Sequence, residues 1–181
     1  AISIIVMGAT GRMGSIIARL VEEAEDLQLA AVLDRPEAVH RLTGFEKAGI
    51  PVSSNLASIL PRCPKAVIID FTAPEATMAT VQAAAVYGNP VVIGTTGFSP
   101  EQLAELDSLA QKHPLFRSAN MSVGINVIMD ILPQLTSLLG DAYDVEMMEI
   151  HHNKKKDAPS GTALLLAEPL LKAKGLTDSA I

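Results

Sequence analysis

The chain has 181 residues, of which 49% are hydrophobic and 19% are charged, and its formal net charge is −6. This length suits one domain, or one domain with part of a second, and the composition is that of a globular protein. The negative charge and an aromatic content of 3% argue against a nucleic-acid partner.

Cysteine content and the N-terminal sequence predict the compartment. The single cysteine, Cys63, excludes an internal disulfide framework and fits a reducing cytoplasm; we expect it to be a packing residue. The N-terminus begins directly with a strand-like run, which predicts no signal peptide, and no apolar run approaches the roughly 20 residues that span a bilayer. We therefore expect a cytoplasmic protein with no membrane partner, and no pattern predicts a metal site.

The first 35 residues predict a β-turn-α-β unit. Ile2–Met7 is a short β-branched apolar run, typical of a buried parallel strand. A helix with one apolar face is expected to run to about Glu25, and Leu27–Leu33 is expected to form a second strand. The turn between the first strand and the helix has the sequence Gly8-Ala9-Thr10-Gly11-Arg12-Met13-Gly14.

Each glycine of this turn has a physical purpose in a dinucleotide-binding unit. Gly8 allows the tight turn, Gly11 lets the backbone approach a pyrophosphate, and Gly14 lets the helix pack closely on the sheet. Asp34 ends the second strand, where a carboxylate can bind the adenine ribose and repel a 2′-phosphate, which favours NADH. Arg35 can hold that phosphate instead, so the preference between NADH and NADPH stays open.

The middle of the chain continues the alternation of strands and helices. Residues 36–64, rich in proline and glycine, are expected to hold one or two short helices, with His40 on the surface. Lys65–Asp70 is the next predicted strand. Thr72 and Glu75 then predict a capping box for a helix that ends at about Tyr87.

Two further strands complete the predicted sheet. Pro90–Ile93 is followed by Gly94-Thr95-Thr96-Gly97, which suits a loop at the nicotinamide half of a cofactor as well as a plain turn. Ser99 to Gln102 predicts a capped helix to about Lys112, with His113 exposed at its end, before the strand Leu115–Arg117. The order β-α-β-α-β-α-β-α-β predicts an α/β fold with a doubly wound parallel sheet.

The sequence changes character near residues 118–124, where we expect a domain boundary. Residues 1–121 would be the dinucleotide-binding Rossmann domain, and 122–181 the start of an α+β domain for substrate and oligomerisation. Ser122–Leu139 is a predicted helix that Pro133 bends, and Asp144–Ile150 is a predicted strand. The last helix is expected from about Gly161, with Pro169 kinking or dividing it.

The stretch from His151 to Thr162 combines three chemical features. It holds two adjacent imidazoles, suited to proton transfer near neutral pH, and three consecutive lysines, which attract anions. Ser160 caps the predicted helix, whose free N–H groups bind carboxylate or phosphate. The stretch therefore predicts a site for an anionic small molecule that must be protonated, although a solvated basic loop before a helix would have the same sequence.

Several motifs together resemble one family. They are the glycine turn, Ile69-Asp70-Phe71-Thr72, Gly94-Thr95-Thr96-Gly97, Ser118-Ala119-Asn120-Met121-Ser122-Val123-Gly124, and Glu149 to His152 with Lys155 to Ala163. The chain resembles the 4-hydroxy-tetrahydrodipicolinate reductase (dihydrodipicolinate reductase) family over essentially its whole length. Members normally continue well beyond this end, so the second domain is expected to be incomplete.

The resemblance implies a reaction, an assembly and a role for each matching residue. It implies reduction of a small dicarboxylate, (2S,4S)-4-hydroxy-2,3,4,5-tetrahydrodipicolinate, by NADH or NADPH in lysine and diaminopimelate biosynthesis, by a homotetramer. The implied catalytic residues are His151, for proton transfer, and Lys155, and the implied substrate-binding residues are His152, Gly161 and Thr162. The implied cofactor-binding residues are Gly8, Ala9, Thr10, Gly11, Arg12 and Met13 at the pyrophosphate, Asp34 and Arg35 at the adenosine, and Gly94, Thr95, Thr96, Ser118, Ala119, Asn120 and Met121 at the nicotinamide half.

Two alternatives stay open at this point. Another Rossmann oxidoreductase, such as an aspartate dehydrogenase, would share the glycine turn but has no reason to carry the His-His-Lys-Pro-Ser-Gly-Thr residues. A truncated, non-catalytic module would bind NAD(P)H without turnover.

Overall fold

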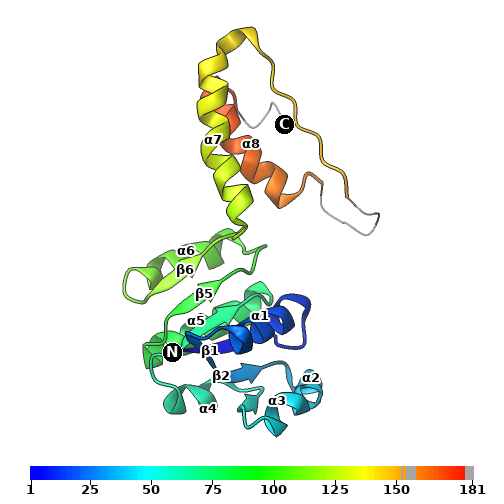
Figure 1. Cartoon of the computed structure of the whole chain (residues 1–181). Coiled ribbons are helices and arrows are strands. Elements are labelled where there is room, and N and C mark those ends of the chain that lie inside the picture. The colour runs from blue at the N-terminus through cyan, green and yellow to red at the C-terminus, as the bar shows by residue number, and fades with distance from the viewer. Residues whose placement is uncertain (152, 154–157, 178–181) are drawn as a thin grey trace. The chain divides into compact units, whose positions relative to one another are not determined.

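A computed structural model describes residues 1–151, 153 and 158–177 of the chain. The chain divides into two compact units, Ala1–Ser118 and Ala119–Ile181, and each is described by itself (Figure 1).

The first unit is built on a parallel sheet of six strands, which confirms the predicted fold class. In the sheet the strands follow the order β3-β2-β1-β4-β5-β6. The chain winds outward from β1 to β3 and then from β4 to β6, so the topological switch lies between β1 and β4. The strands are β1 (Ile2–Met7), β2 (Leu27–Leu33), β3 (Val52–Ser53), β4 (Val67–Asp70), β5 (Val91–Ile93) and β6 (Leu115–Arg117).

Alternation along β1 explains why both faces of the sheet are covered. Ile5 belongs to one buried cluster, whereas its neighbours Ile4 and Val6 belong to a second, because successive strand side chains point to opposite faces. Buried residues of α4, α5 and α6 belong to the Ile5 cluster, and those of α1 to the other. The helices are α1 (Arg12–Glu23), α2 (Pro36–Val39), α3 (Thr43–Lys47), α4 (Leu56–Ile59), α5 (Pro74–Tyr87) and α6 (Pro100–Ala110), with 3-10 turns η1 (His40–Leu42) and η2 (Leu60–Arg62).

Local expectations in this unit have mixed outcomes. Ser99 caps α6, as predicted, and forms a capping box with Gln102. Cys63 packs against the Ile5 cluster as expected, and burial raises the pKa of its thiol against the opposing charge of Arg62. The capping box expected at Thr72 is wrong. The N-cap of α5 is Ala73, because the Thr72 hydroxyl instead donates to the Asp70 carboxylate at 2.6 Å.

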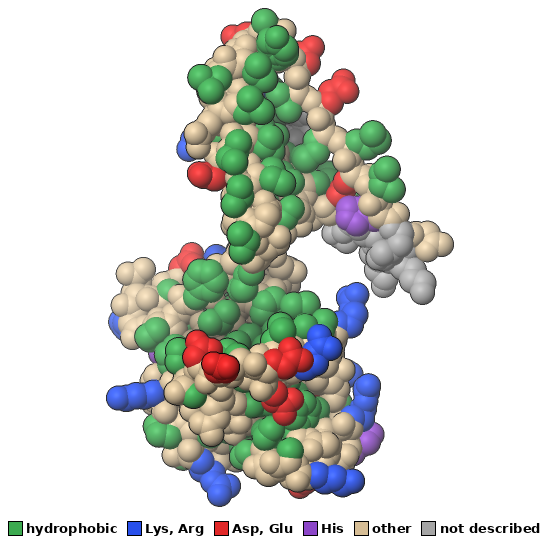
Figure 2. Space-filling view, in the orientation of Figure 1, with side chains coloured by type: hydrophobic (Ala, Val, Ile, Leu, Met, Phe, Trp, Pro, Cys, Tyr) green, Lys and Arg blue, Asp and Glu red, His purple; other side chains and the backbone are tan. Residues whose placement is uncertain are grey.

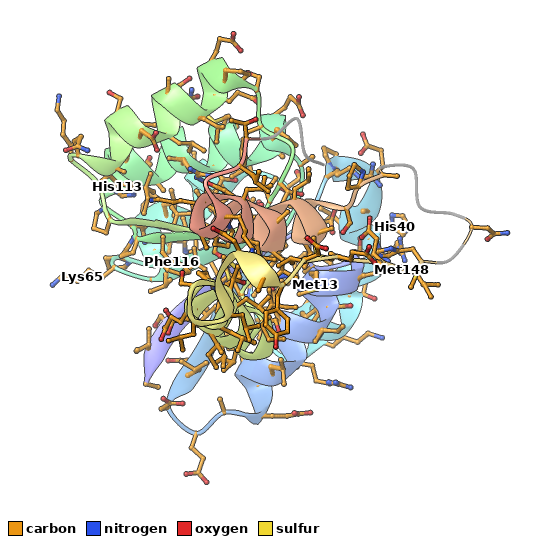
Figure 3. All side chains as sticks on the ribbon, turned by 90° about the horizontal axis from the view of Figure 1, so that it is seen from above. Met13, His40, Lys65, His113, Phe116 and Met148 are labelled. Atoms are coloured by element: carbon orange, nitrogen blue, oxygen red, sulfur yellow. The ribbon has the colours of Figure 1, made fainter. Side chains whose placement is uncertain are left out.

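The two histidines of this unit, His40 and His113, are labelled in Figure 3, and their exposure differs. His40 is exposed, as predicted. His113 was expected to be exposed, but its residue surface is only 7% accessible. The chain passes from α6 directly into the sheet at this point, because the Pro114 carbonyl accepts a hydrogen bond from the Val91 amide of β5. The position of His113 between α6 and the sheet explains why it is buried.

The described residues of the second unit form two helices packed on each other, α7 (Val123–Leu139) and α8 (Gly161–Lys174), with a 3-10 turn, η3 (Gly140–Ala142), after the first. Ser160 caps α8, as expected, and Ser122 caps α7, whereas Pro169 lies inside α8 without dividing it. Lys174 donates to the carbonyl oxygens of Gly140 and Tyr143, at 2.6 and 2.8 Å. The last turn of α8 is therefore hydrogen-bonded to the segment that follows α7.

The strand predicted over Asp144–Ile150 is wrong. These residues are exposed and unassigned to any strand, and the described part of this unit contains no strand at all. The alternating pattern of the segment is present, but a strand exists only where a neighbouring backbone completes its hydrogen bonds.

Helix α7 carries an exposed apolar surface. Figure 2 shows hydrophobic side chains gathered along it. Val127, Ile131 and Leu135, which we call the apolar stripe, are 49%, 53% and 48% accessible. By length and composition alone, residues Val123–Ala142 are able to cross a membrane, so the expectation that no such run exists is wrong. Core helices of soluble proteins satisfy the same two criteria.

Candidate cofactor and substrate sites

The glycine turn brings the end of β1 very close to the start of α1. Gly8 has φ +65°, and a Cβ atom on Gly14 would lie 2.1 Å from the Gly8 carbonyl oxygen. The first helical hydrogen bond of α1 runs from the Ser15 amide to the Gly11 carbonyl. The amides of Arg12 and Met13 are therefore not used by the helix, which leaves an N-terminus able to bind an anion.

Asp34 joins this turn to the end of β2. Its Oδ2 accepts from the Thr10 amide and its Oδ1 from the Arg35 amide, both at 2.8 Å. Partial burial raises the pKa of the Asp34 carboxyl, but the hydrogen bonds from Thr10 and Arg35 and the Arg35 charge outweigh burial and lower that pKa overall. The carboxylate is therefore held ionised beside the turn.

A cavity of about 570 Å³ lies against these groups, within the usual range for small-molecule sites. It includes Gly8, Asp34 and Arg35, which the sequence singled out. The loop after β3 and helix α5 contribute residues that no motif had pointed to. The lining residues are Met7, Gly8, Leu33, Asp34, Arg35, Ser54, Asn55, Leu56, Ala57, Thr72, Ala73, Ala76, Ala79, Thr80 and Ala83.

A buried carboxylate organises the loops after β4 and β5. Asp70 is fully buried, and its Oδ1 accepts from the Thr72 amide and from the hydroxyls of Thr72 and Thr77, while the Asp70 carbonyl accepts from the Gly94 amide. Thr77 and Thr95 share a hydrogen bond of 2.8 Å. Among the described residues, Asp70 Oδ2 is buried without a hydrogen-bond partner.

This cluster limits what the Gly94-Thr95-Thr96 loop can offer a ligand. The Thr95 side chain is buried and occupied inside the cluster, whereas Thr96 is exposed. A Cβ atom on Gly94 would lie 2.0 Å from the Phe71 ring, so this position has no room for a side chain. Ligand contacts at this loop would therefore come from its backbone and from Thr96.

The last group of predicted cofactor residues spans the division between the units. Ser118 belongs to the first unit, where its amide continues the sheet by donating to the Ile93 carbonyl. Ala119, Asn120 and Met121 belong to the second. Asn120 donates to the Thr162 hydroxyl at 3.3 Å, so a residue predicted at the cofactor contacts one predicted at the substrate.

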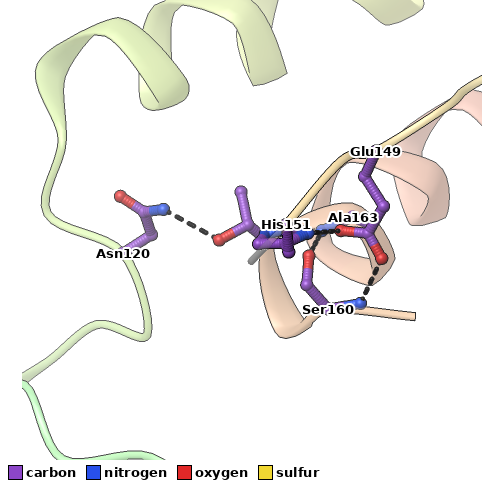
Figure 4. Close-up of polar contacts among 6 residues, drawn as sticks. Asn120, Glu149, His151, Ser160 and Ala163 are labelled. Carbon is purple, nitrogen blue, oxygen red and sulfur yellow. Dashed lines mark hydrogen bonds and ion pairs between the residues drawn. The ribbon is translucent and has the colours of Figure 1, made fainter. Parts of the chain in front are cut away.

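Figure 4 shows His151 and Ser160 near the start of α8. Ser160 Oγ accepts from the Ala163 amide, and the first helical bond runs from Leu164 to Ser160. The amides of Gly161 and Thr162 are thus not used by the helix. The predicted residues His152 and Lys155, like Lys154, Lys156 and Asp157, lie outside the described residues.

His151 is paired with a neighbouring carboxylate. Its Nδ1 lies 3.5 Å from Glu149 Oε2, and Glu149 Oε1 accepts from the Ser160 amide at 2.7 Å. Within residues 1–151, 153 and 158–177, no group of three or more His, Cys, Asp or Glu side chains is placed to hold a metal ion.

The first unit is of the Rossmann type and has a cavity at its glycine turn. The second unit has an imidazole near a helix N-terminus whose first amides are not used by the helix. Rossmann-type units of this kind bind the cofactor in nicotinamide-dependent reductases and dehydrogenases. The family model for the N-terminus of dihydrodipicolinate reductase matches residues 2–121, and that for its C-terminus matches residues 124–179. The chain belongs to the dihydrodipicolinate reductase family.

Individual relatives agree with this assignment. The chain is 58% identical to a 4-hydroxy-tetrahydrodipicolinate reductase of Nitratidesulfovibrio vulgaris (strain DP4) over 94% of its own length, and 51% identical to that of Desulfovibrio desulfuricans (strain ATCC 27774) over 96%. It spans 65% and 66% of those relatives.

Solved structures share the fold. The chain is similar to the dipicolinate-bound dihydrodipicolinate reductase of Paenisporosarcina sp. TG-14, with a TM-score of 0.76 and 31% identity, covering 96% of this chain and 66% of that one. A myo-inositol 2-dehydrogenase from Lactobacillus plantarum shares the fold at a TM-score of 0.58 and 15% identity, over 74% of this chain and 41% of the other.

Proposed function

We propose that the protein reduces (2S,4S)-4-hydroxy-2,3,4,5-tetrahydrodipicolinate with NADH or NADPH, giving tetrahydrodipicolinate and water for lysine and diaminopimelate biosynthesis in the cytoplasm. The observation that carries the proposal is membership of the reductase family over both matched segments, 2–121 and 124–179. Family membership also argues against the aspartate dehydrogenase alternative.

The cofactor would occupy the cavity of the first unit. The unused amides at the start of α1 suit its pyrophosphate, and the Asp34 carboxylate, with lone pairs left on both oxygens, suits the adenine ribose. The exposed guanidinium of Arg35 lines the same cavity and suits a 2′-phosphate. Since both side chains are present, we propose that NADH and NADPH are both used. The bound cofactor would supply hydride.

The substrate would bind at the start of α8. A ring dicarboxylate needs groups that hold carboxylates, and the unused amides of Gly161 and Thr162 are such groups. Support for this choice comes from the Paenisporosarcina relative, which is described as dipicolinate-bound. In this proposal His152 and Lys155 complete the substrate and catalytic groups, as the family resemblance implies.

His151 would handle the proton. Hydride arriving at an electron-poor ring carbon leaves negative charge that must be protonated, and an imidazole delivers a proton readily near neutral pH. The side chain of His151 is 41% accessible, so it is open to a ligand.

The assembly implied by the family is a homotetramer, and we propose it for the protein. Its support is the accessibility of the apolar stripe, Val127, Ile131 and Leu135, since apolar patches of this kind mark association surfaces.

Oxidation of NADH and of NADPH, followed with freshly generated hydroxy-tetrahydrodipicolinate, tests the reaction. The chain and a His151→Gln variant are compared, and cofactor binding is measured separately by fluorescence. We expect turnover by the chain and a loss of about 10²-fold or more in the variant. Cofactor binding without turnover in either protein would mean that this chain is a non-catalytic dinucleotide-binding module. Equal turnover in both would remove the role given to His151.

A further inference from the structure

We infer that Glu149 is a positioning residue that fixes the orientation and the tautomer of His151. The catalytic role of Glu149 rests on the proposed function, because His151 is the proton donor of that reaction. The pairing of the two side chains, however, can be measured without any turnover.

The local geometry places Glu149 where it can act on two neighbours at once. Residues 149 and 151 are two apart in an extended segment, so their side chains leave it on the same side. One carboxylate oxygen accepts from the Ser160 amide at 2.7 Å, and the other lies 3.5 Å from His151 Nδ1 (Figure 4). Glu149 therefore links the imidazole to the N-cap of α8.

The link matters because Ser160 begins the helix whose free amides are proposed to bind the substrate. Ser160 is buried and fixed at both ends, its amide by Glu149 and its hydroxyl by the Ala163 amide. Through Ser160 the imidazole of His151 is held at a set place relative to the amides of Gly161 and Thr162. A proton donor and an anion site are useful only when their separation is fixed.

The carboxylate also decides which ring nitrogen carries the proton in neutral His151. A carboxylate oxygen facing Nδ1 favours a proton on that nitrogen, which leaves the lone pair on Nε2. Nε2 is then the atom that accepts or, after protonation of the ring, delivers a proton. The side chains are 41% and 29% accessible, and an ion pair this exposed adds little stability. Orientation, rather than folding, is the property that Glu149 controls.

Glu149→Gln is the informative substitution because it keeps the size of the side chain and removes one acceptor. The backbone N–H of Ser160 needs an acceptor, so it keeps the remaining side-chain oxygen at position 149. The side-chain NH₂ group then faces His151 Nδ1 and, because it is a donor, favours a lone pair on that nitrogen. The proton of neutral His151 should move to Nε2. Glu146→Gln, on the same exposed segment, is the matched control.

Two-bond ¹H–¹⁵N correlation spectra of the ¹⁵N-histidine-labelled chain distinguish the two tautomers directly. We expect the Nδ1–H form in the chain and in Glu146→Gln, and mainly the Nε2–H form in Glu149→Gln, with no change in melting temperature. Glu149→Asp, which keeps both acceptors, should return the ring toward the Nδ1–H form. A merely structural role would lower the melting temperature and leave the tautomer unchanged. An unchanged tautomer in Glu149→Gln would overturn the inference.

The kinetic consequence is measured in parallel. We expect kcat of Glu149→Gln to fall by about 10²-fold, with KM for NADH unchanged, because proton transfer is affected and cofactor binding is not. Absence of turnover in the unsubstituted chain would refute the proposed function, and the spectra would still decide whether Glu149 sets the tautomer. If Glu149→Gln had full activity although His151 was in the Nε2–H form, the contact between Glu149 and His151 would have no role in catalysis.

Discussion

Gly14 packs directly against the backbone of the glycine turn that precedes α1. A Cβ atom there would lie 2.1 Å from the Gly8 carbonyl oxygen and 2.9 Å from the Ala9 Cα. Backbone atoms cannot rotate away as a side chain can, so Gly14→Ala must push α1 from the sheet. We expect the free energy of unfolding, measured in urea, to fall by about 1–3 kcal/mol or more.

Gly44 provides the matched control for this substitution. It lies in α3, its φ is not positive, and a Cβ atom there would have nothing within 4 Å. Gly44→Ala should therefore be neutral or stabilising by up to about 1 kcal/mol. Equal unfolding energies for the two variants would contradict the close approach of α1 to β1.

Asp34 should give the first unit a pH-dependent part of its stability. Because the pKa of its carboxyl is lowered in the folded state from 3.8, the stabilisation is complete above that value and is lost as pH falls through the lower folded pKa. In Asp34→Asn one amide, of Thr10 or Arg35, loses its acceptor. We expect the difference in unfolding energy between the two proteins to be constant from about pH 5 to 7 and to shrink below 3.8. A difference that grows on acidification would contradict the assignment.

At the scale of elements, the loops after β4 and β5 depend on one carboxylate. Asp70→Asn keeps the shape but replaces the carboxylate by a neutral amide, so the hydrogen bonds from the Thr72 amide and the Thr72 and Thr77 hydroxyls lose their charged acceptor, at a cost of about 1–3 kcal/mol. We expect lower stability and, since Gly94 is held by the Asp70 carbonyl and Thr95 by the cluster, weaker NADH binding by fluorescence titration.

Asp107→Asn is the control for this variant, because Asp107 is exposed and forms a weak 3.9 Å ion pair with Arg117. It should change neither stability nor NADH affinity appreciably. Unchanged NADH affinity in a destabilised Asp70→Asn would show that the cluster supports the fold without shaping the cofactor site.

Elements with a strong local signal were predictable, and those decided by distant contacts were not. β1 and β2 are apolar on both faces, and α5 ends at Gly88 in the left-handed region, so sequence pattern alone located them. The two-residue edge strand β3 is too short to show any period. Tertiary packing buries His113 and brings the Thr72 hydroxyl into a hydrogen bond with Asp70. A local sequence pattern does not indicate either of these contacts.

The same distinction applies to the sites. The carboxylate of Asp34 and the glycine turn were predictable, because the spacing of a βαβ unit brings them together, and the Thr10 amide indeed donates to Asp34. Ser54 and Ala73 line the same cavity but come from the loop after β3 and the start of α5, where no motif identifies them. The contact of Glu149 with Ser160 joins residues that are eleven apart in the chain, and no local sequence pattern indicates that they meet.

At the scale of the whole molecule, the two units differ in how well they bury apolar surface. The first unit has two buried clusters, one on each face of its sheet, whereas the second leaves Val127, Ile131 and Leu135 about half accessible. These three residues follow one another at i, i+4 and i+8, so they form a continuous strip along α7 rather than scattered contacts with solvent. Apolar surface arranged in this way favours association.

We therefore expect the chain to associate in solution and the substitution of the apolar stripe to prevent it. Light scattering after gel filtration should give a mass above that of the monomer for the chain, and close to it for the triple variant Val127→Gln, Ile131→Gln, Leu135→Gln. Val86→Gln is the control, since Val86 is a single apolar residue of α5 that is 80% accessible and belongs to no strip. It should leave the mass of the associated chain unchanged, because an isolated apolar side chain buries too little area to hold two molecules together. A chain that is monomeric before substitution, or a triple variant that associates as strongly as the chain, would show that the apolar stripe of α7 is not the surface through which molecules meet.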